Sequence, residues 1–223
     1  MKSWVIPEAG PEFVCQMEAV LDVYARPYAP ARPVVCLDEK RKQLVRELRP
    51  GFTGSHGVRH EDYEYERSGV GVLYMVCEPL GARREVLVEE SQDRLAWART
   101  VLHLAETMYP DAERITLVQD NLAAHKPSAL YEILPPERAR AIVERLEVVN
   151  TPVHGSWLNV AEIELSVLGR QALARRIGTE AELRRLSAAW ASERTAAQKG
   201  VDWQFTTADA RIKLKHLYPS YSL

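Results

Sequence analysis

Residues 34–38 read Val34-Val35-Cys36-Leu37-Asp38, an apolar run that is followed at once by an acid. A short, unbroken apolar run is typical of a strand buried on both faces of a sheet. Residues 115–120, Ile115-Thr116-Leu117-Val118-Gln119-Asp120, have a similar character. A carboxylate at the end of a buried strand needs a partner, because burying the charge alone is expensive. We therefore expect two central strands, each ended by an acid that a cation, an arginine or a helix N-terminus satisfies.

The segments around these two strands predict a mixed α/β sheet. Two further strands, about 70–76 and 85–89, are separated by Pro79-Leu80-Gly81, which suits an antiparallel hairpin. Strands and helical patterns alternate afterwards, which favours a sheet with both antiparallel and parallel pairs. Another short strand is expected at 146–149, and helices at about 10–25, 91–109 (with Ser91 as its cap), 136–145, 157–176, 179–197 and, opened by a Thr206–Asp209 capping box, near the C-terminus.

Composition excludes several classes of protein. The 223 residues are 46% hydrophobic and 27% charged, so global disorder is not expected. A net charge of −2 excludes histone-like binding of nucleic acid through bulk charge. No apolar run is long enough to cross a membrane, and the N-terminus has no apolar signal core. Three cysteines without metal-type spacing, Cys15, Cys36 and Cys77, predict buried, reduced thiols in a cytoplasmic protein.

A third acid lies in the segment Trp157-Leu158-Asn159-Val160-Ala161-Glu162-Ile163-Glu164-Leu165. On a helix, Leu158, Ala161, Leu165, Leu168 and Ala172 form one apolar stripe. Glu162 flanks this stripe, and Glu164 lies about 160° away from Glu162 around the axis, at 100° per residue. Only one of the two can face the same site, and we expect Glu162 to be the one against the sheet.

Three carboxylates from two strand ends and one helix form an oxygen-ligand site for hard cations. Magnesium suits such a site, because it accepts few protein carboxylates together with water and substrate phosphate. Two such ions would support phosphodiester cleavage. Zinc is disfavoured, since no His/Cys cluster has ligand spacing. Taken singly, each acid is also explained as a loop-capping or solvated carboxylate, so this chemistry depends on the three acting together.

Three blocks of the sequence resemble the catalytic blocks of mariner-like DDE transposases, in particular the bacterial insertion-sequence six-thirty group. They are Val34 to Lys40 (VVCLDEK), Val118 to His125 (VQDNLAAH) and His154 to Glu162 (HGSWLNVAE), and the tail Asp202 to Pro219 is also similar. The resemblance covers about 10–220. The three blocks in order, with HGSWLN before the glutamate, make it specific.

The resemblance implies an α/β, RNase H-like fold, in which three antiparallel strands precede alternating helices and parallel strands in a mixed five-stranded sheet flanked by helices. It implies Asp38, Asp120 and Glu162 as the catalytic and metal-binding triad, with two Mg²⁺ or Mn²⁺ ions and Asp38 between them. The implied reactions are hydrolysis at transposon ends and attack of the freed 3′-hydroxyl on target DNA. The implied partners are double-stranded DNA and a second copy of the chain.

Further residues are candidates for supporting roles around this triad. Asn121 and His125 could orient Asp120 or contact a phosphate, and the residues before the Glu162 helix could contact DNA or fix the helix entry. Basic side chains on a DNA enzyme are candidates for phosphate contacts. The supporting candidates are Asn121, His125, His154, Trp157 and Asn159, and the DNA-binding candidates are Lys40, Arg41, Lys42, Arg170, Arg175 and Arg176.

We expect three segments: an N-terminal helix and Pro-rich connector at 1–32, the catalytic domain at 33–200, and a basic C-terminal helix and tail at 201–223. Related transposases begin with helix-turn-helix modules, which are not expected here, so a separate N-terminal polypeptide could supply end recognition. Two alternatives remain. One is an inert relic that binds DNA or a partner, and the other is a general RNase H-like nuclease.

Overall fold

A computed structural model describes residues 10–49, 52–54, 56–60 and 63–219, with only the backbone described at 52, 59 and 60. Its main sheet has five strands in the order β5-β4-β1-β6-β7. β1 (Val34–Glu47), β4 (Tyr65–Glu78) and β5 (Arg83–Glu89) pair antiparallel, whereas β6 (Ile115–Gln119) and β7 (Leu146–Asn150) continue the sheet from β1 in parallel. The predicted mixed five-stranded sheet is therefore confirmed.

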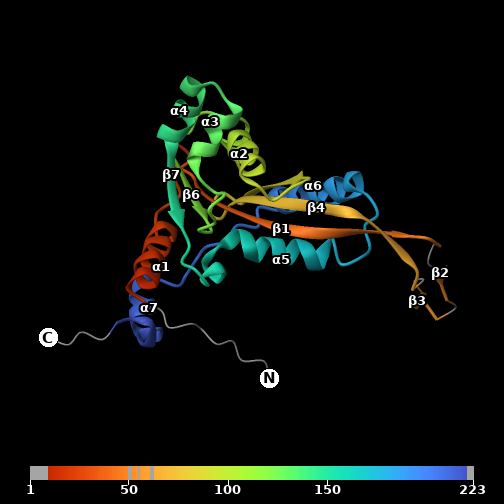
Figure 1. The fold of residues 1–223 in the computed structure, drawn as a ribbon. Helices are drawn as coiled ribbons and strands as arrows, with labels where there is room; N and C mark the ends of the chain where they lie inside the picture. The colour runs from red at the N-terminus through yellow and green to blue at the C-terminus, as the bar shows by residue number, and fades with distance from the viewer. Residues whose placement is uncertain (1–9, 50–51, 55, 61–62, 220–223) are drawn as a thin grey trace.

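β1 and β4 form a hairpin that is much longer than the apolar runs predict. β1 continues past Asp38 to Glu47, with a bulge between Leu44 and Val45. β2 (Phe52–Thr53) and β3 (Arg59–His60) form a short antiparallel pair at the outer end of this β1–β4 hairpin (Figure 1). The prediction that Asp38 ends its strand was wrong, because antiparallel pairing sustains the strand where its side chains become polar. The loop predicted at 50–62 lies partly outside the described residues.

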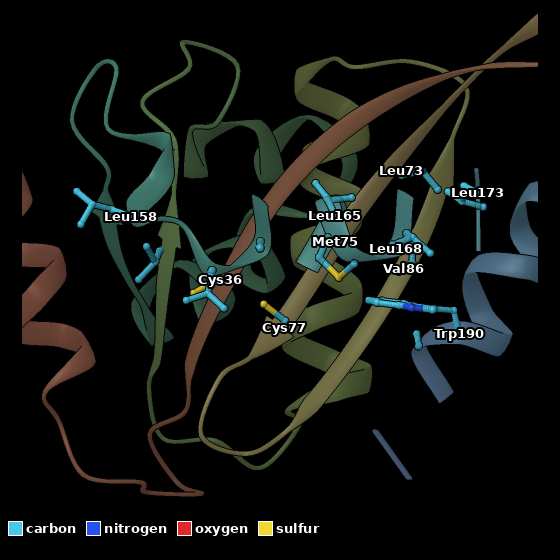
Figure 2. Packing of buried hydrophobic residues seen from close by; sticks show 14 of the residues in the cluster. Cys36, Leu73, Met75, Cys77, Val86, Leu158, Leu165, Leu168, Leu173 and Trp190 are labelled. Atoms are coloured by element: carbon cyan, nitrogen blue, oxygen red, sulfur yellow. The ribbon is translucent and has the colours of Figure 1, made fainter. Parts of the chain in front are cut away.

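Alternate strand residues pack against two layers of helices. α2 (Arg94–His103), α3 (Leu130–Ile133) and α4 (Pro136–Arg145) cover the face that carries Val35, Leu37 and Tyr74. α1 (Pro11–Tyr24), α5 (Val160–Gln171), α6 (Glu180–Ala196) and α7 (Thr207–Lys213) share the cluster on the other face. Figure 2 shows Cys36, Met75 and Cys77 of the sheet in this second core, with Leu165 and Leu168 of α5 and Trp190 of α6.

The helix ends differ from the predictions at several places: the helix predicted at 157–176 is α5 over Val160–Gln171, and the helix predicted at 91–109 begins as α2 over Arg94–His103. Asp93, not Ser91, caps α2 by accepting from the amides of Leu95 and Ala96, while the Ser91 hydroxyl donates to Asp93. A π-helical turn, η1 (Leu104–Met108), follows α2. Among the 3₁₀ turns, η2 (Pro127–Ala129) precedes α3, η3 (Ser156–Leu158) precedes α5, and η4 (Lys215–Leu217) follows α7. The predicted capping box of Thr206 and Asp209 is confirmed at the start of α7.

The segments outside the sheet pack on the same core. α1 and α7 both contribute apolar side chains to this core, and Arg211 of α7 donates two hydrogen bonds of 2.8 Å to Glu18 of α1.

Cys36 and Cys77 are buried free thiols, as predicted, but Cys15 is exposed on the outer face of α1, so its predicted burial was wrong. None of the helices in the described ranges is long and apolar enough to cross a membrane.

Candidate active site

The strand register places Asp38 and Asp120 at the same level of the sheet. Cys36 of β1 pairs with Val118 of β6 in parallel. Asp38 comes two residues after Cys36, and Asp120 comes two residues after Val118. Cys36 and Val118 both belong to the core on the α5 face. Because side chains two residues apart share a face of a strand, Asp38 points to the side of the sheet on which α5 lies.

Glu162 reaches the same region from the first turn of α5. The pKa of Asp38 is raised to about 7, mainly by burial; the carboxylates of Glu39, Asp120 and Glu162 add to the rise, and the hydrogen bond from the Glu39 amide opposes it. Asp120 and Glu162 are thus both near enough to Asp38 for their charges to raise its pKa, and a cation at Asp38 would offset their effect.

The prediction that Glu162 is the helix acid pressed against the sheet was wrong. Glu162 is exposed, whereas Glu164 is 2% exposed. Glu164 lies between two arginines, 3.1 Å from Arg84 of β5 and 2.9 Å from Arg194 of α6. The reason is that Leu158 lies in the 3₁₀ turn ahead of the helix, so the buried arc of α5 is centred closer to Glu164. Burial thus marks the structural acid, and exposure leaves Glu162 accessible to a ligand.

Asn159 fixes the entry of α5 relative to β1. Its side-chain oxygen accepts from the Ala161 amide as the helix N-cap, and its amide donates to the backbone carbonyl of Leu37 at 2.9 Å. Tyr24 of α1 adds a hydrogen bond of 2.7 Å to the carbonyl of Leu158. Since Leu37 precedes Asp38 and Asn159 begins the turn that carries Glu162, this buried asparagine connects the supports of two of the three acids.

His125 lies between Asp120 and a fourth acid that the sequence analysis did not single out. Its Nδ1 is 2.5 Å from Oδ1 of Asp120, and its Nε2 is 3.4 Å from Oε1 of Glu39. Burial lowers the pKa of His125, but the two carboxylates outweigh burial and raise it to about 9. A protonated imidazole therefore offsets the negative charge of both acids. Strand alternation was the available signal, because Glu39 follows Asp38 and must point to the opposite face.

The other supporting candidates are at the surface. Asn121 and His154 are exposed, with His154 at a left-handed φ of 65°, and Trp157 in the turn η3 is 42% exposed. Within the described ranges, no hydrogen bond or ion pair joins these three residues to Asp38, Asp120 or Glu162. Their proposed contacts with DNA stay predictions.

Part of the predicted basic set lines one groove beside the acids. Lys40, Arg41 and Lys42 of β1 and Arg170 of α5 border a groove of about 290 Å³. Most of the basic set also has protein partners: Lys42 donates to the carbonyl of Leu173, and Arg170 donates to the hydroxyl of Ser166. Arg41 donates to Gln92, Arg175 pairs with Glu182, and Arg176 stacks on Tyr65.

Two overlapping groups of side chains could therefore hold a cation. Ligand atoms of Glu39, Asp120 and His125 lie within 4.8 Å of one another, but the imidazole already fills the space between the two carboxylates. Asp38, Asp120 and Glu162 supply oxygen donors only, which is the donor set that Mg²⁺ prefers. A divalent cation bound at Asp38 would offset the burial and the neighbouring negative charges that raise the pKa of this residue.

Comparisons with known proteins identify a family and a fold. A family model described as DDE superfamily endonuclease matches residues 33–184. The fold is similar to that of the Mos1 mariner paired end complex with Mn (16% identity, TM-score 0.56) and the Mos1 strand transfer complex (16% identity, TM-score 0.57). These matches cover 89% and 97% of this chain. No curated protein matches the chain.

The length of the match differs between whole and partial relatives. The chain spans 63% of the length of the proteins in both Mos1 complexes. It spans 94% of the separately solved catalytic domain of Mos1 mariner transposase (16% identity, TM-score 0.54), and that match covers 96% of this chain. The similarity confirms the predicted RNase H-like fold.

Proposed function

This chain belongs to the DDE superfamily endonucleases, and on that premise we propose that it is the catalytic part of a mariner-like DNA transposase. The proposed reactions are divalent-metal-dependent hydrolysis of a phosphodiester at a transposon end and strand transfer into target DNA by the freed 3′-hydroxyl. The observation that supports the proposal is the β1–β6 register, which brings Asp38 and Asp120 to one level of the sheet, together with Glu162 in the first turn of α5, whose charge raises the pKa of Asp38.

We assign Asp38, Asp120 and Glu162 as the ligands of the metal ions. Two Mg²⁺ or Mn²⁺ ions, when bound, would activate the attacking oxygen and stabilise the leaving oxygen. Asp38 is central in this assignment, because the charges of both other acids raise its pKa. The chain's own contribution is to hold the carboxylates in place before substrate arrives, through the β1–β6 register and the Asn159 bridge between β1 and α5.

The groove of Lys40, Lys42 and Arg170 is the proposed path of the DNA backbone next to the acids. Lysine and arginine contacts to phosphates position DNA without reading its sequence. Arg41, Arg175 and Arg176 would add phosphate contacts on its borders. Since all these contacts are independent of sequence, recognition of a particular transposon end would need another part of the protein or a separate helix-turn-helix polypeptide.

The proposed assembly is a homodimer on paired DNA ends, working in the bacterial cytoplasm on DNA of the nucleoid. The structural similarity to Mos1 paired end complexes supports this proposal only through the shared fold. Sedimentation with and without a DNA duplex measures it directly. A dimer that forms on DNA is the expected result, and a monomer on DNA at all concentrations contradicts it.

The triad is tested by Mg²⁺- or Mn²⁺-dependent cleavage and strand transfer on labelled duplex DNA. Asp38→Asn, Asp120→Asn and Glu162→Gln should each reduce product to background, because each removes one charged oxygen ligand and little else. Glu137→Gln, an exposed acid of α4, is the matched control and should keep wild-type activity. Glu164→Gln is unsuitable as a control, because this residue is buried between two arginines.

Two alternative outcomes separate the competing classes of protein. Cleavage of an RNA–DNA hybrid in preference to nicked or duplex DNA would indicate a general RNase H-like nuclease. Absence of both metal binding and cleavage in the wild type would indicate an inert relic that binds DNA or a partner. Full activity in any one of the three triad variants contradicts the assignment of that residue.

A further inference from the structure

A line of polar side chains runs inward from the surface behind the acids, on the face of the sheet opposite α5. Gln92 receives a hydrogen bond from Arg41 at 2.8 Å and donates one of 2.7 Å to Oε1 of Glu39. The same Glu39 oxygen faces His125, whose other ring nitrogen faces Asp120. The line therefore begins at a surface arginine and ends on one of the three catalytic candidates.

The histidine in this line is held on every side. Its side chain is 2% exposed, and the Glu39 side chain is 1% exposed. The ring stacks on Trp97, with centroids 6.0 Å apart and an interplanar angle of 17°. Gln119 donates to the backbone carbonyl of His125 and accepts from the Trp97 indole. A ring fixed in this way offers Asp120 a nitrogen in one direction only.

The contacts of Asp120 leave one carboxylate oxygen for a ligand. In the described part of the chain, His125 Nδ1 lies 2.5 Å from Oδ1 as an ion-pair contact without hydrogen-bond geometry, and the Leu122 amide donates to the same oxygen at 3.4 Å. A carboxylate on a loop is free to rotate unless one oxygen is held, and outer contacts of this kind commonly orient metal-binding carboxylates.

We propose that Glu39 and His125 are positioning residues for the metal site: Glu39 fixes the imidazole, and the imidazole holds Oδ1 of Asp120 so that Oδ2 is presented to the cation. This inference rests on the proposed function. It assigns Glu39, which follows Asp38 in sequence, to the opposite face of β1 and to a separate task. It also excludes His125 as a metal ligand, since both ring nitrogens are turned to carboxylates.

Two substitutions of His125 distinguish positioning from mere filling of space. The amide nitrogen of Asn is two bonds from Cβ, as Nδ1 is in His, whereas the amide nitrogen of Gln is three bonds from Cβ, as Nε2 is. His125→Asn therefore keeps a donor toward Asp120, and His125→Gln keeps one toward Glu39. Tyr74→Phe is the control, because it removes a buried hydroxyl without a partner from the same face, opposite Glu39 in the register.

The experiment titrates each full-length protein with Mn²⁺ alone and follows free Mn²⁺ by electron paramagnetic resonance. We expect His125→Gln to weaken Mn²⁺ binding roughly 10- to 100-fold, as for other outer contacts of metal ligands. His125→Asn should remain within a few-fold of wild type, and Tyr74→Phe should be unchanged. Thermal unfolding without metal and binding of duplex DNA, measured in parallel, should not separate the Asn and Gln variants.

The outcomes separate this inference from the function beneath it. If wild type binds Mn²⁺ and Asp38→Asn does not, the proposed metal site stands, and equal binding by His125→Gln and wild type then overturns the positioning role alone. Equal loss in the Asn and Gln variants, matched by equal loss of thermal stability, overturns it as well. If wild type binds no Mn²⁺, the proposed function and this inference fall together.

Discussion

Glu162 and Glu164 show how two identical side chains on one helix serve different ends. Glu162 is exposed in the first turn of α5, where its charge raises the pKa of Asp38. Glu164 is enclosed, and Arg84, the arginine that meets it from β5, is itself 5% exposed. An enclosed carboxylate between two guanidiniums cannot exchange partners with a substrate, so its work is to join α5, β5 and α6.

Removing the Glu164 charge should therefore destabilise the fold. Breaking a buried ion pair leaves an uncompensated charge, here on Arg84, and typically costs about 3–5 kcal/mol. Glu164→Gln should lower the free energy of unfolding by that order in a urea titration. Glu162→Gln should change it by less than about 0.5 kcal/mol, as surface substitutions usually do. Equal stability of the two variants would contradict the structural assignment.

At the scale of elements, the sequence predicted what local patterns determine. The helix over 11–24, the strand before Asp120, the Pro-initiated α4 and the capping box of α7 all follow from spacing or caps. The extension of β1 beyond Asp38 could not be predicted in this way, because its polar residues are held by pairing with β4, a long-range contact. Helical periodicity predicted Glu162 against the sheet and was wrong, because Leu158 lies in the turn before α5 and because Arg84 and Arg194 pair with Glu164.

In the candidate site too, residues in recognisable blocks of sequence were predicted, and the residue whose role depends on distant contacts was not. Asp38, Asp120 and Glu162 were found through their blocks of sequence and the resemblance those blocks carry, and Asn159 and His125 came with the same blocks. Glu39 was missed because strand alternation places it on the face opposite Asp38 but does not show what it contacts there. Its task depends on Gln92 and His125, which are distant in the chain.

The end of α1 is joined to the edge strand β7 by an ion pair that should depend on pH. Arg26 donates two hydrogen bonds of 3.0 Å to Glu147, and Thr116 of β6 adds a third. The Arg26 hydrogen bonds hold the pKa of Glu147 below its ordinary 4.5. The pair therefore stabilises the folded state above pH 4.5, and this contribution is lost as the pH falls through the lowered pKa.

Glu147→Gln should thus reduce the free energy of unfolding by about 0.5–1 kcal/mol at pH 7, since the pair is partly exposed. The difference from wild type should shrink below pH 4.5. Arg26→Gln should give the same profile, because it removes the same pair from the other side. Urea unfolding at pH 7 and pH 3.5 measures both, and a difference that grows in acid would contradict the assignment.

On the scale of the whole molecule, the C-terminal segment completes the core on the α5 face. Ala210 is buried in that cluster, and Val201, Trp203, Phe205 and Leu214 pack against it as partly buried side chains. The Trp203 ring lies 5.1 Å from the ring of Tyr24, the residue that supports the entry of α5. The matched family region ends at residue 184, well before this segment.

A chain that ends after Gly200 should therefore be much less stable. Each buried apolar side chain contributes about 1.5–3 kcal/mol, so loss of several approaches the whole stability of a domain, about 5–15 kcal/mol. We expect a large fall in Tm by circular dichroism, or loss of cooperative unfolding. A chain that ends after Pro219 is the control and should unfold as the full chain does. An unchanged Tm in the shorter chain would contradict this prediction.

β1 has an antiparallel neighbour on one side and a parallel one on the other, and this has a consequence for the order in which the protein folds. The hairpin with β4 joins segments that are near in sequence, whereas the pairing of Val34 with Thr116 spans β4, β5 and α2. Contacts between distant segments are expected to form late, because the loop must be closed before pairing rewards it. Asp38 and Asp120 come together through that pairing. We therefore expect a partly folded chain with its hairpin formed not yet to bring together the two acids that we propose as metal ligands.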